Sequence, residues 1–267
     1  MRIALAQIIT GRDLAGNLAL VEDYAARAQA GGAELVVFPE ATMRAFGNSL
    51  LDIAEPLDGP WATRVRCIAA DHGIVIVAGM FTPGTADDGG KVRNTLLVTG
   101  RGVEASYDKI HLFDAFGFAE SDTVDAGTEP ATFEFNGVTF GLATCYDIRF
   151  PDLFTANADR GADVNIVCAS WGSGPGKADQ WKLLARARAL DSTTMVLACG
   201  QGDPASLGIE PKGAAPTGVG HSVVVSPLGD VLEELDGAPG LLFANLDTAT
   251  VREARTKLPV LANRHKF

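Results

Sequence analysis

Three residues with complementary chemistry, Glu40, Lys109 and Cys145, lie in or beside runs that favour β-strands. Glu40 follows an apolar run closed by a proline, so its carboxylate is expected at the carboxyl-terminal rim of a sheet. Lys109 lies within a β-prone run, and Cys145 follows another apolar run. In open α/β sheets ligands bind beyond the carboxyl ends of strands. The joint occurrence of Glu40, Lys109 and Cys145 therefore favours one shared site over three separate structural roles.

Each of these residues also has a structural interpretation. Glu40 could be a solvated carboxylate at a strand end, Lys109 a charge that blocks edge pairing, and Cys145 a buried thiol. The chain has 4 cysteines, and they form neither a CxxC pair nor a zinc-finger pattern. We therefore expect free thiols in a reducing cytoplasm, not a disulfide scaffold. The cysteines expected to be small core residues are Cys67, Cys168 and Cys199.

Two familiar motifs, a Cys–His pair and a phosphate loop, have partial counterparts in the chain. Histidine often activates a cysteine nucleophile, so a Cys–His enzyme remains an alternative; the histidines are His72, His111, His221 and His265. The glycine-rich run Gly172–Lys177 resembles a phosphate loop but misses both templates. Lys177 stands where a dinucleotide fingerprint needs glycine, and Ala178 where a Walker loop needs Ser or Thr. We interpret this run as a loop beside a pocket.

Apolar runs of strand length alternate with helical patterns along the chain. Several runs are apolar throughout, which is typical of strands covered on both faces. Strands are predicted over Ile3–Ile8, Glu34–Phe38, Ile74–Gly79, Asn94–Thr99, Val138–Thr144, Val164–Ala169, Thr194–Cys199 and Ser222–Ser226. Helices are predicted over Leu14–Ala28, from Pro60 to Ile68 with Asp58 as cap, from Asp152 onward, and over Asp179–Leu190.

So many strands suggest two sheets in a layered α/β domain. Two runs rich in glycine and proline, Pro83–Gly90 and Gly202–Gly218, are interpreted as surface loops. Residues 1–267 are therefore predicted to form a single domain.

Composition narrows the choice of partners. Asp and Glu number 33 against 22 Lys and Arg, a net charge of −11, which argues against nucleic acid or an anionic membrane as main partner. No apolar run approaches the ~20 residues that span a bilayer. The first residues fit a strand better than a signal peptide. A cytoplasmic protein that acts on small molecules is expected.

The sequences around the three residues resemble those of the nitrilase superfamily of carbon–nitrogen hydrolases. Glu40 stands in Phe-Pro-Glu, Lys109 in Tyr-Asp-Lys-Ile-His-Leu-Phe-Asp, and Cys145 in Cys-Tyr-Asp-Ile-Arg-Phe-Pro. The resemblance covers nearly the whole chain, and its further matches are Glu120-Ser121, Arg186–Ala189 and Gly220–Gly229.

The chain differs from the usual pattern of that superfamily at two places. Tyr146 follows the cysteine where true nitrilases usually carry Trp, so the chain is more similar to the amidase-type branch that includes ω-amidase and deaminated glutathione amidase. The segment Ala169–Gly172 also differs from the usual pattern. That difference concerns the substrate pocket and not the chemistry.

The resemblance implies a four-layer α-β-β-α sandwich that dimerises, and a Glu–Lys–Cys triad. Cys145 would attack an amide, Glu40 would be the general base, and Lys109 with the Tyr146 N–H would stabilise the oxyanion. Glu120, the family's second glutamate, would position Lys109 or move protons. A helix after Cys145 would lower the pKa of the thiol, and burial would raise that of Glu40. The scheme requires no metal or cofactor.

The expected substrate is a small linear amide with a carboxylate, hydrolysed through a thioester with release of ammonia. A second cation should anchor the carboxylate. The candidates are Arg149, Lys177 and Arg44, and Trp171 is a further candidate for contact with the substrate. The classes that compete with this function are Cys–His acyl transfer and a non-catalytic binding protein.

Two neighbouring residues are interpreted as structural or left open. His111 lies two residues from Lys109 and would share its face if the run is extended; we interpret it as a hydrogen-bonding residue and not a base. Arg149 could instead pair with Asp147 or Asp152.

Overall fold

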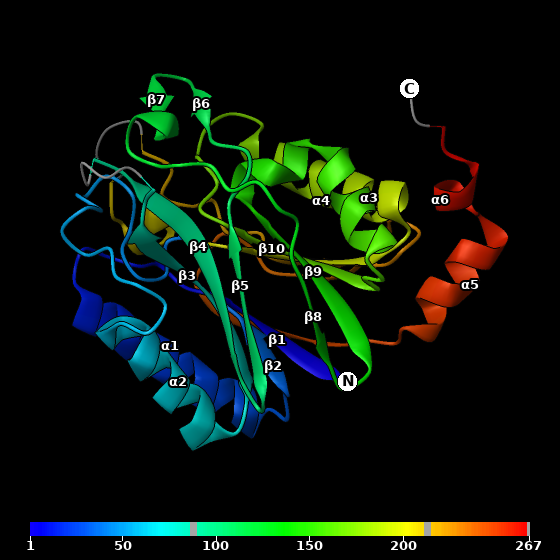
Figure 1. Ribbon diagram of the computed structural model, residues 1–267, viewed down its shortest axis with the longest axis horizontal. Coiled ribbons are helices and arrows are strands. Elements are labelled where there is room, and N and C mark those ends of the chain that lie inside the picture. The colour runs from blue at the N-terminus through cyan, green and yellow to red at the C-terminus, as the bar shows by residue number, and fades with distance from the viewer. Residues whose placement is uncertain (86–89, 211–214, 266–267) are drawn as a thin grey trace.

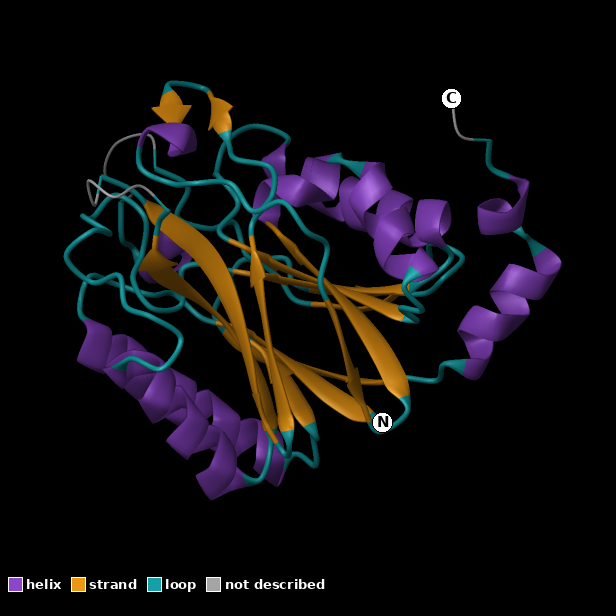
Figure 2. Cartoon of the chain, in the orientation of Figure 1, coloured by secondary structure: helices purple, strands orange, loops and turns teal. Residues whose placement is uncertain are grey.

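The computed structural model describes residues 1–85, 90–210 and 215–265. Parts of the two glycine- and proline-rich runs, 86–89 and 211–214, lie outside the described residues. Two six-stranded sheets face each other, as Figures 1 and 2 show. The first has the order β14-β1-β2-β3-β4-β5 and the second β13-β12-β11-β10-β9-β8.

The strands of the first sheet are β1 (Arg2–Gln7), β2 (Leu35–Val37), β3 (Val75–Pro83), β4 (Val92–Gly100), β5 (Val103–Asp108) and β14 (Gly240–Asn245). Those of the second are β8 (Thr132–Phe135), β9 (Val138–Thr144), β10 (Val164–Ala169), β11 (Met195–Gly200), β12 (Val223–Val225) and β13 (Val231–Glu234). In each sheet three adjacent strands run parallel, β1-β2-β3 and β9-β10-β11. Each of the other strands pairs antiparallel with its neighbour.

Helices cover the outer face of each sheet. The helices are α1 (Leu14–Ala30), α2 (Pro60–His72), α3 (Pro151–Asp159), α4 (Lys177–Ser192), α5 (Ala249–Lys257) and α6 (Val260–Asn263). The pair α1 and α2 packs on the first sheet, and α3 and α4 pack on the second (Figure 1). The predicted four-layer α-β-β-α sandwich is confirmed.

The alternation of strand residues explains the layers. In β1, Ile3 and Leu5 point into the core between the sheets, whereas Ala4 and Ala6 point toward the helix layer. Because successive strand side chains point to opposite faces, a strand buried on both faces must be apolar at every position. The continuous apolar runs in the sequence have this cause.

Every strand predicted from the sequence is present, with ends shifted by a few residues at most. The β-prone run around Lys109 corresponds only to the last residues of β5. The strands not predicted are β8, β13, β14 and the short hairpin of β6 (Asp114–Ala115) and β7 (Phe118–Ala119). The prediction of Asp58 as the N-cap of α2 is wrong, because Gly59 is the N-cap. The carboxylate of Glu55 accepts the hydrogen bond of the Ala62 N–H. Within the described residues, no helix combines the length and apolarity that crossing a membrane requires.

Candidate active site

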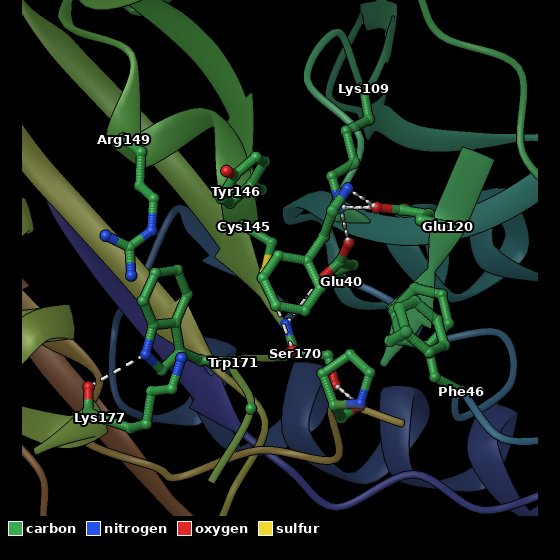
Figure 3. Close-up of a pocket in the computed structure, with 14 residues that line it drawn as sticks. Glu40, Phe46, Lys109, Glu120, Cys145, Tyr146, Arg149, Ser170, Trp171 and Lys177 are labelled. Atoms are coloured by element: carbon green, nitrogen blue, oxygen red, sulfur yellow. Dashed lines mark hydrogen bonds and ion pairs between the residues drawn. The ribbon is translucent and has the colours of Figure 1, made fainter. Parts of the chain in front are cut away.

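Glu40, Lys109 and Cys145 line one cavity (Figure 3). Glu40 follows β2, and Lys109 comes directly after β5, so it lies just beyond the strand rather than within it. Both belong to the first sheet, whereas Cys145 directly follows β9 of the second. The two sheets therefore bring the three side chains together at the carboxyl ends of their strands.

The backbone at Glu40 approaches β3 so closely that only glycine fits opposite it. A Cβ atom on Gly79 would lie 2.9 Å from the Glu40 Cα and 2.7 Å from the Ala41 nitrogen. The Gln201 side chain also donates a hydrogen bond to the Glu40 carbonyl oxygen at 2.9 Å. These contacts fix where the Glu40 carboxylate enters the cavity.

Glu40, Lys109 and Glu120 form a buried charged cluster. Glu120 begins the short 3₁₀ turn η1 (Glu120–Asp122). Lys109 Nζ lies 3.0 Å from Glu40 Oε1 and 2.7 Å from Glu120 Oε2. The exposed fractions of the three residues are 0%, 2% and 1%. A buried charge is tolerated when it is paired and hydrogen-bonded, and this cluster meets that condition. Glu120 is therefore a buried partner of Lys109 and not a solvated carboxylate on a loop.

Uncharged donors complete the cluster. The Asn94 side chain donates to Glu40 Oε1 at 2.8 Å and to Glu120 Oε1 at 3.1 Å, and the Ser170 N–H donates to Glu40 Oε2 at 2.7 Å. The Phe113 N–H donates to Glu120 Oε2 at 2.7 Å. Sequence reading missed Asn94, because an asparagine within a strand carries no signal of its partners.

The environment moves three pKa values upward. Burial raises the pKa of Glu40 despite the opposing ammonium of Lys109. Burial alone would lower the pKa of Lys109, but the carboxylates of Glu120 and Glu40 outweigh it and raise that pKa well above its usual value. Burial, followed by the Glu40 carboxylate, raises the pKa of the Cys145 thiol well above its usual value.

The expected lowering of the Cys145 pKa is therefore wrong. The element after the cysteine is the short 3₁₀ helix η2 (Cys145–Arg149), not a long α-helix. The buried thiol also faces a carboxylate, which disfavours a second negative charge. The raised pKa of Glu40 agrees with the expectation from the sequence.

Cys145 has an unusual backbone conformation, with φ of 49°. A non-glycine residue in this left-handed region is strained and persists only where its surroundings fix it. Its Sγ lies 3.8 Å from the Ser170 carbonyl oxygen, which accepts the S–H hydrogen bond. The strained turn directs the thiol into the cavity.

Asp147 holds this turn and the segment around Lys109 at once. Its carboxylate accepts hydrogen bonds from the Thr144 N–H at 2.8 Å, the Tyr107 hydroxyl at 2.6 Å and the His111 N–H at 2.9 Å. Tyr107 and His111 flank Lys109 in the chain, and Asp147 is fully buried. One carboxylate thus ties the two segments that carry Lys109 and Cys145. No motif or periodicity around Asp147 indicates this role.

His111 has a structural environment. Its Nδ1 lies 2.7 Å from Asp147 Oδ1, and its ring stacks on Phe150 with centroids 3.7 Å apart. The condition for a face shared with Lys109 is not met, because β5 ends at Asp108 and strand alternation does not reach these residues. No histidine lines the cavity within the described part of the chain.

Arg149, Lys177 and Trp171 line the other end of the cavity (Figure 3). Arg149 donates to the Gln180 side chain at 2.9 Å and lies over the Trp171 ring, 5.2 Å from its centroid. It pairs with neither Asp147 nor Asp152. Lys177 Nζ lies 4.1 Å from the centroid of the Phe116 ring. Burial and the neighbouring Arg149 lower the pKa of Lys177, so the two cations repel each other.

Arg44 lies away from this cavity. Its guanidinium donates to the Asp52 carboxylate at 2.9 Å and to the Ser49 carbonyl oxygen at 2.9 Å. It therefore holds the loop after Glu40 and does not compete as a substrate anchor. The cavity wall contains Tyr146 and three phenylalanines that sequence reading did not identify, Phe46, Phe113 and Phe118.

The cysteines other than Cys145 divide into two kinds. Cys168 and Cys199 are fully buried, as expected for small core residues. Cys67 is exposed on α2, so its assignment to the core is wrong. Across residues 1–85, 90–210 and 215–265, no three His, Cys, Asp or Glu side chains gather in a way that could hold a metal ion.

The fold is that of the nitrilase superfamily, and the two sheets of this sandwich together build the cavity. Residues 2–256 match the carbon–nitrogen hydrolase family, and the chain belongs to that family. The predicted enzyme class, a hydrolase of carbon–nitrogen bonds, is confirmed.

Sequence similarity to known proteins extends over the whole chain or nearly all of it. A protein of Mycobacterium tuberculosis strain H37Rv, named only as a hydrolase, is 56% identical over 273 residues, which cover 100% of this chain and 96% of that protein. The deaminated glutathione amidase of Escherichia coli O157:H7 is 33% identical over 253 residues, covering 93% and 91% of the two chains.

A solved structure is similar as well. It is a variant of the amidase from Nesterenkonia sp. AN1 in which acrylamide has added to the active-site cysteine. The identity is 28%, the TM-score is 0.77, and the match covers 97% of this chain and 98% of that one.

Proposed function

We propose that the protein is an amidase that hydrolyses small linear amides through a thioester on Cys145. One observation carries the proposal: Glu40, Lys109 and Cys145 come from two different sheets and line one cavity. The modified active-site cysteine of the similar Nesterenkonia amidase supports a cysteine nucleophile. The amidase names among the relatives support an amide as substrate.

The raised pKa values suit a proton that moves during attack. Cys145 rests as a thiol, and Glu40 takes its proton as the sulfur attacks the amide carbon. Glu40 then gives this proton to the nitrogen, the C–N bond breaks, and ammonia leaves from a primary amide. Water adds to the thioester with Glu40 as base, which releases the carboxylic acid and restores the thiol.

Lys109 and the Tyr146 N–H stabilise the oxyanion in this scheme. The ammonium of Lys109 has three N–H groups and contacts three carboxylate oxygens, two of which belong to Glu120. When the two Glu120 oxygens share a single N–H, the remaining N–H serves the oxyanion. Glu120 keeps Lys109 charged and in place. Such a preorganised donor is typically worth about 3–4 kcal/mol of the barrier.

The cations at the far end support a substrate with a carboxylate. Arg149 and Lys177 both line the cavity and repel each other, and an anion between them would relieve that repulsion. We propose that they anchor the carboxylate while the Trp171 ring packs against the acyl chain. Binding energy used for orientation raises turnover as well as affinity.

The alternatives find less support. A Cys–His enzyme needs a histidine beside Cys145, but His111 contacts Asp147 and His221 contacts Glu234. A binding protein without catalysis would not need the buried charged cluster beside the thiol. We also propose that the chain forms one domain, assembles as a homodimer and works in the cytoplasm; its four free cysteines suit a reducing compartment.

The test traps the intermediate. The enzyme is mixed rapidly with a slowly hydrolysed amide, denatured in acid and analysed by peptide mass spectrometry. An acyl group on Cys145 is expected. An acyl group on the exposed Cys67, or ammonia release without any adduct, would overturn the assignment. Cys67→Ser is the matched control and should keep the adduct.

A further inference from the structure

A groove adjoins the catalytic cavity behind two phenylalanines. It lies between residues 46–51 and 118–124. Phe46, Phe118 and Glu120 line both the cavity and this side groove. The rings of Phe46 and Phe118 pack edge to face with centroids 6.3 Å apart. The side groove and the catalytic cavity therefore share these side chains as part of their walls.

The interior of the side groove is apolar. The buried side chains of Leu50 and Val124 line it, and Leu51, which is 48% exposed, lies at its edge. Hydrogen bonds to Lys109, Asn94 and the Phe113 N–H occupy both oxygens of Glu120. Glu120 therefore forms part of the groove wall but has no free oxygen to accept a hydrogen bond from a ligand. An apolar ligand fits such a groove.

The catalytic cavity and the side groove differ in the sign of the charges that line them. Arg149 and Lys177 line the far end of the catalytic cavity, whereas the exposed Asp122 lies on the side groove. An anionic acyl chain is attracted to the first end and repelled from the second. The amine half of an amide becomes an ammonium once it leaves, so it suits the acidic end.

The position of the base agrees with this direction. Glu40, the proposed proton donor to the leaving nitrogen, shares the Asn94 side chain as a donor with Glu120. The nitrogen must face Glu40 to receive its proton, and it then lies on the Glu120 side, next to Phe46 and Phe118.

We propose that the side groove holds an apolar substituent on the amide nitrogen, so that the enzyme hydrolyses secondary amides of small apolar amines. This inference rests on the proposed amidase function. The chemistry is unchanged: the C–N bond breaks, Glu40 delivers the proton, and an alkylamine leaves in place of ammonia.

The experiment compares kcat/KM for succinamate, N-butylsuccinamate and N-(3-carboxypropyl)succinamate by measuring succinate release. The N-butyl substrate should be hydrolysed within ~10-fold of the primary amide or faster, because the groove can bury the butyl chain. The N-carboxypropyl substrate should be slower than the N-butyl one by about 10-fold or more, because the exposed Asp122 opposes its charge.

A blocking variant tests the location. Leu51→Trp should lower the ratio of N-butyl to primary amide hydrolysis by about 10-fold, since the larger ring fills the groove. Leu258→Trp is the control: Leu258 is equally exposed at 48% and lines neither space, and the ratio should stay at the wild-type value.

The outcomes separate this inference from the proposed function. Hydrolysis of succinamate with no hydrolysis of N-butylsuccinamate, or an unchanged ratio in Leu51→Trp, overturns the side groove alone. A preference for the N-carboxypropyl substrate overturns the charge argument. Failure to hydrolyse any of the amides overturns the amidase proposal itself.

Discussion

At the buried end of the cavity, Glu40, Lys109 and Glu120 are fixed by one another and by Asn94 and backbone N–H groups. At the other end, Arg149 and Lys177 contact mainly aromatic rings and one glutamine. Preorganised polar groups stabilise charge without reorganising, whereas loosely held cations can turn toward a ligand. The difference suggests that the buried end performs the chemistry and the cationic end selects the substrate.

The largest expected effect comes from the residue between the two ends. Cys145→Ala should lower kcat for every amide on the order of 10⁴-fold or more, because no other thiol reaches the cavity. Ammonia release measures the loss, and circular dichroism should show an intact fold. If the variant retains substantial turnover, neither end of the cavity belongs to a thioester enzyme.

Lys109→Arg tests the buried end while keeping its charge. The planar guanidinium cannot reproduce the three contacts of a compact ammonium with two carboxylates. We expect kcat to fall about 10²–10³-fold, equally for charged and neutral amides. Steady-state kinetics on both kinds of substrate measure this. Near-normal turnover would reduce Lys109 to a structural cation.

Asp147→Asn tests how tightly the two segments must be tied. The amide cannot accept all the hydrogen bonds that Thr144, Tyr107 and His111 now donate to the carboxylate. A displacement of Cys145 against Lys109 should lower kcat about 10–100-fold with little change in KM. Asp152→Asn, at an exposed site, is the matched control. An equal effect in both variants would contradict the role of Asp147.

The cationic end should show a different pattern. Arg149→Met and Lys177→Met should each reduce the preference for carboxylated over neutral amides of equal length, by roughly 10-fold for the true anchor. Activity on neutral amides should change little. The ratio of the two kcat/KM values is the measurement. If neither variant alters it, the carboxylate binds elsewhere.

The smallest effect is a displaced pH limb. A carboxyl group with a raised pKa takes up its proton at higher pH, so the base form of Glu40 is lost earlier as pH falls. The acid limb of kcat/KM should therefore lie above the ordinary pKa of glutamate. A pH–rate profile on a neutral amide isolates this group from the ionisation of the substrate. A limb at or below the ordinary value would count against Glu40 as the base.

The strands that sequence reading found and missed differ in burial. The central strands, such as β10, are buried at every position and produce continuous apolar runs. The edge strand β13 is exposed at every position, so no apolar pattern marks it. β8 alternates between buried phenylalanines and less buried neighbours over four residues, which is too short to stand out. Edge strands depend on pairing with a neighbour, which local sequence does not report.

The sequence alone determined the layered α/β class and the three chemical groups, because burial imposes apolar runs and the motifs around Glu40, Lys109 and Cys145 are specific. Only the tertiary structure decided which cations join them. Arg44, close to Glu40 in the chain, pairs with Asp52, whereas Lys177, more than thirty residues from Cys145, lines the cavity. It also decided that Asn94 and Asp147 hold the site. The physical reason is that the cavity forms where two sheets meet, and contacts between distant segments leave no periodic signal in either one.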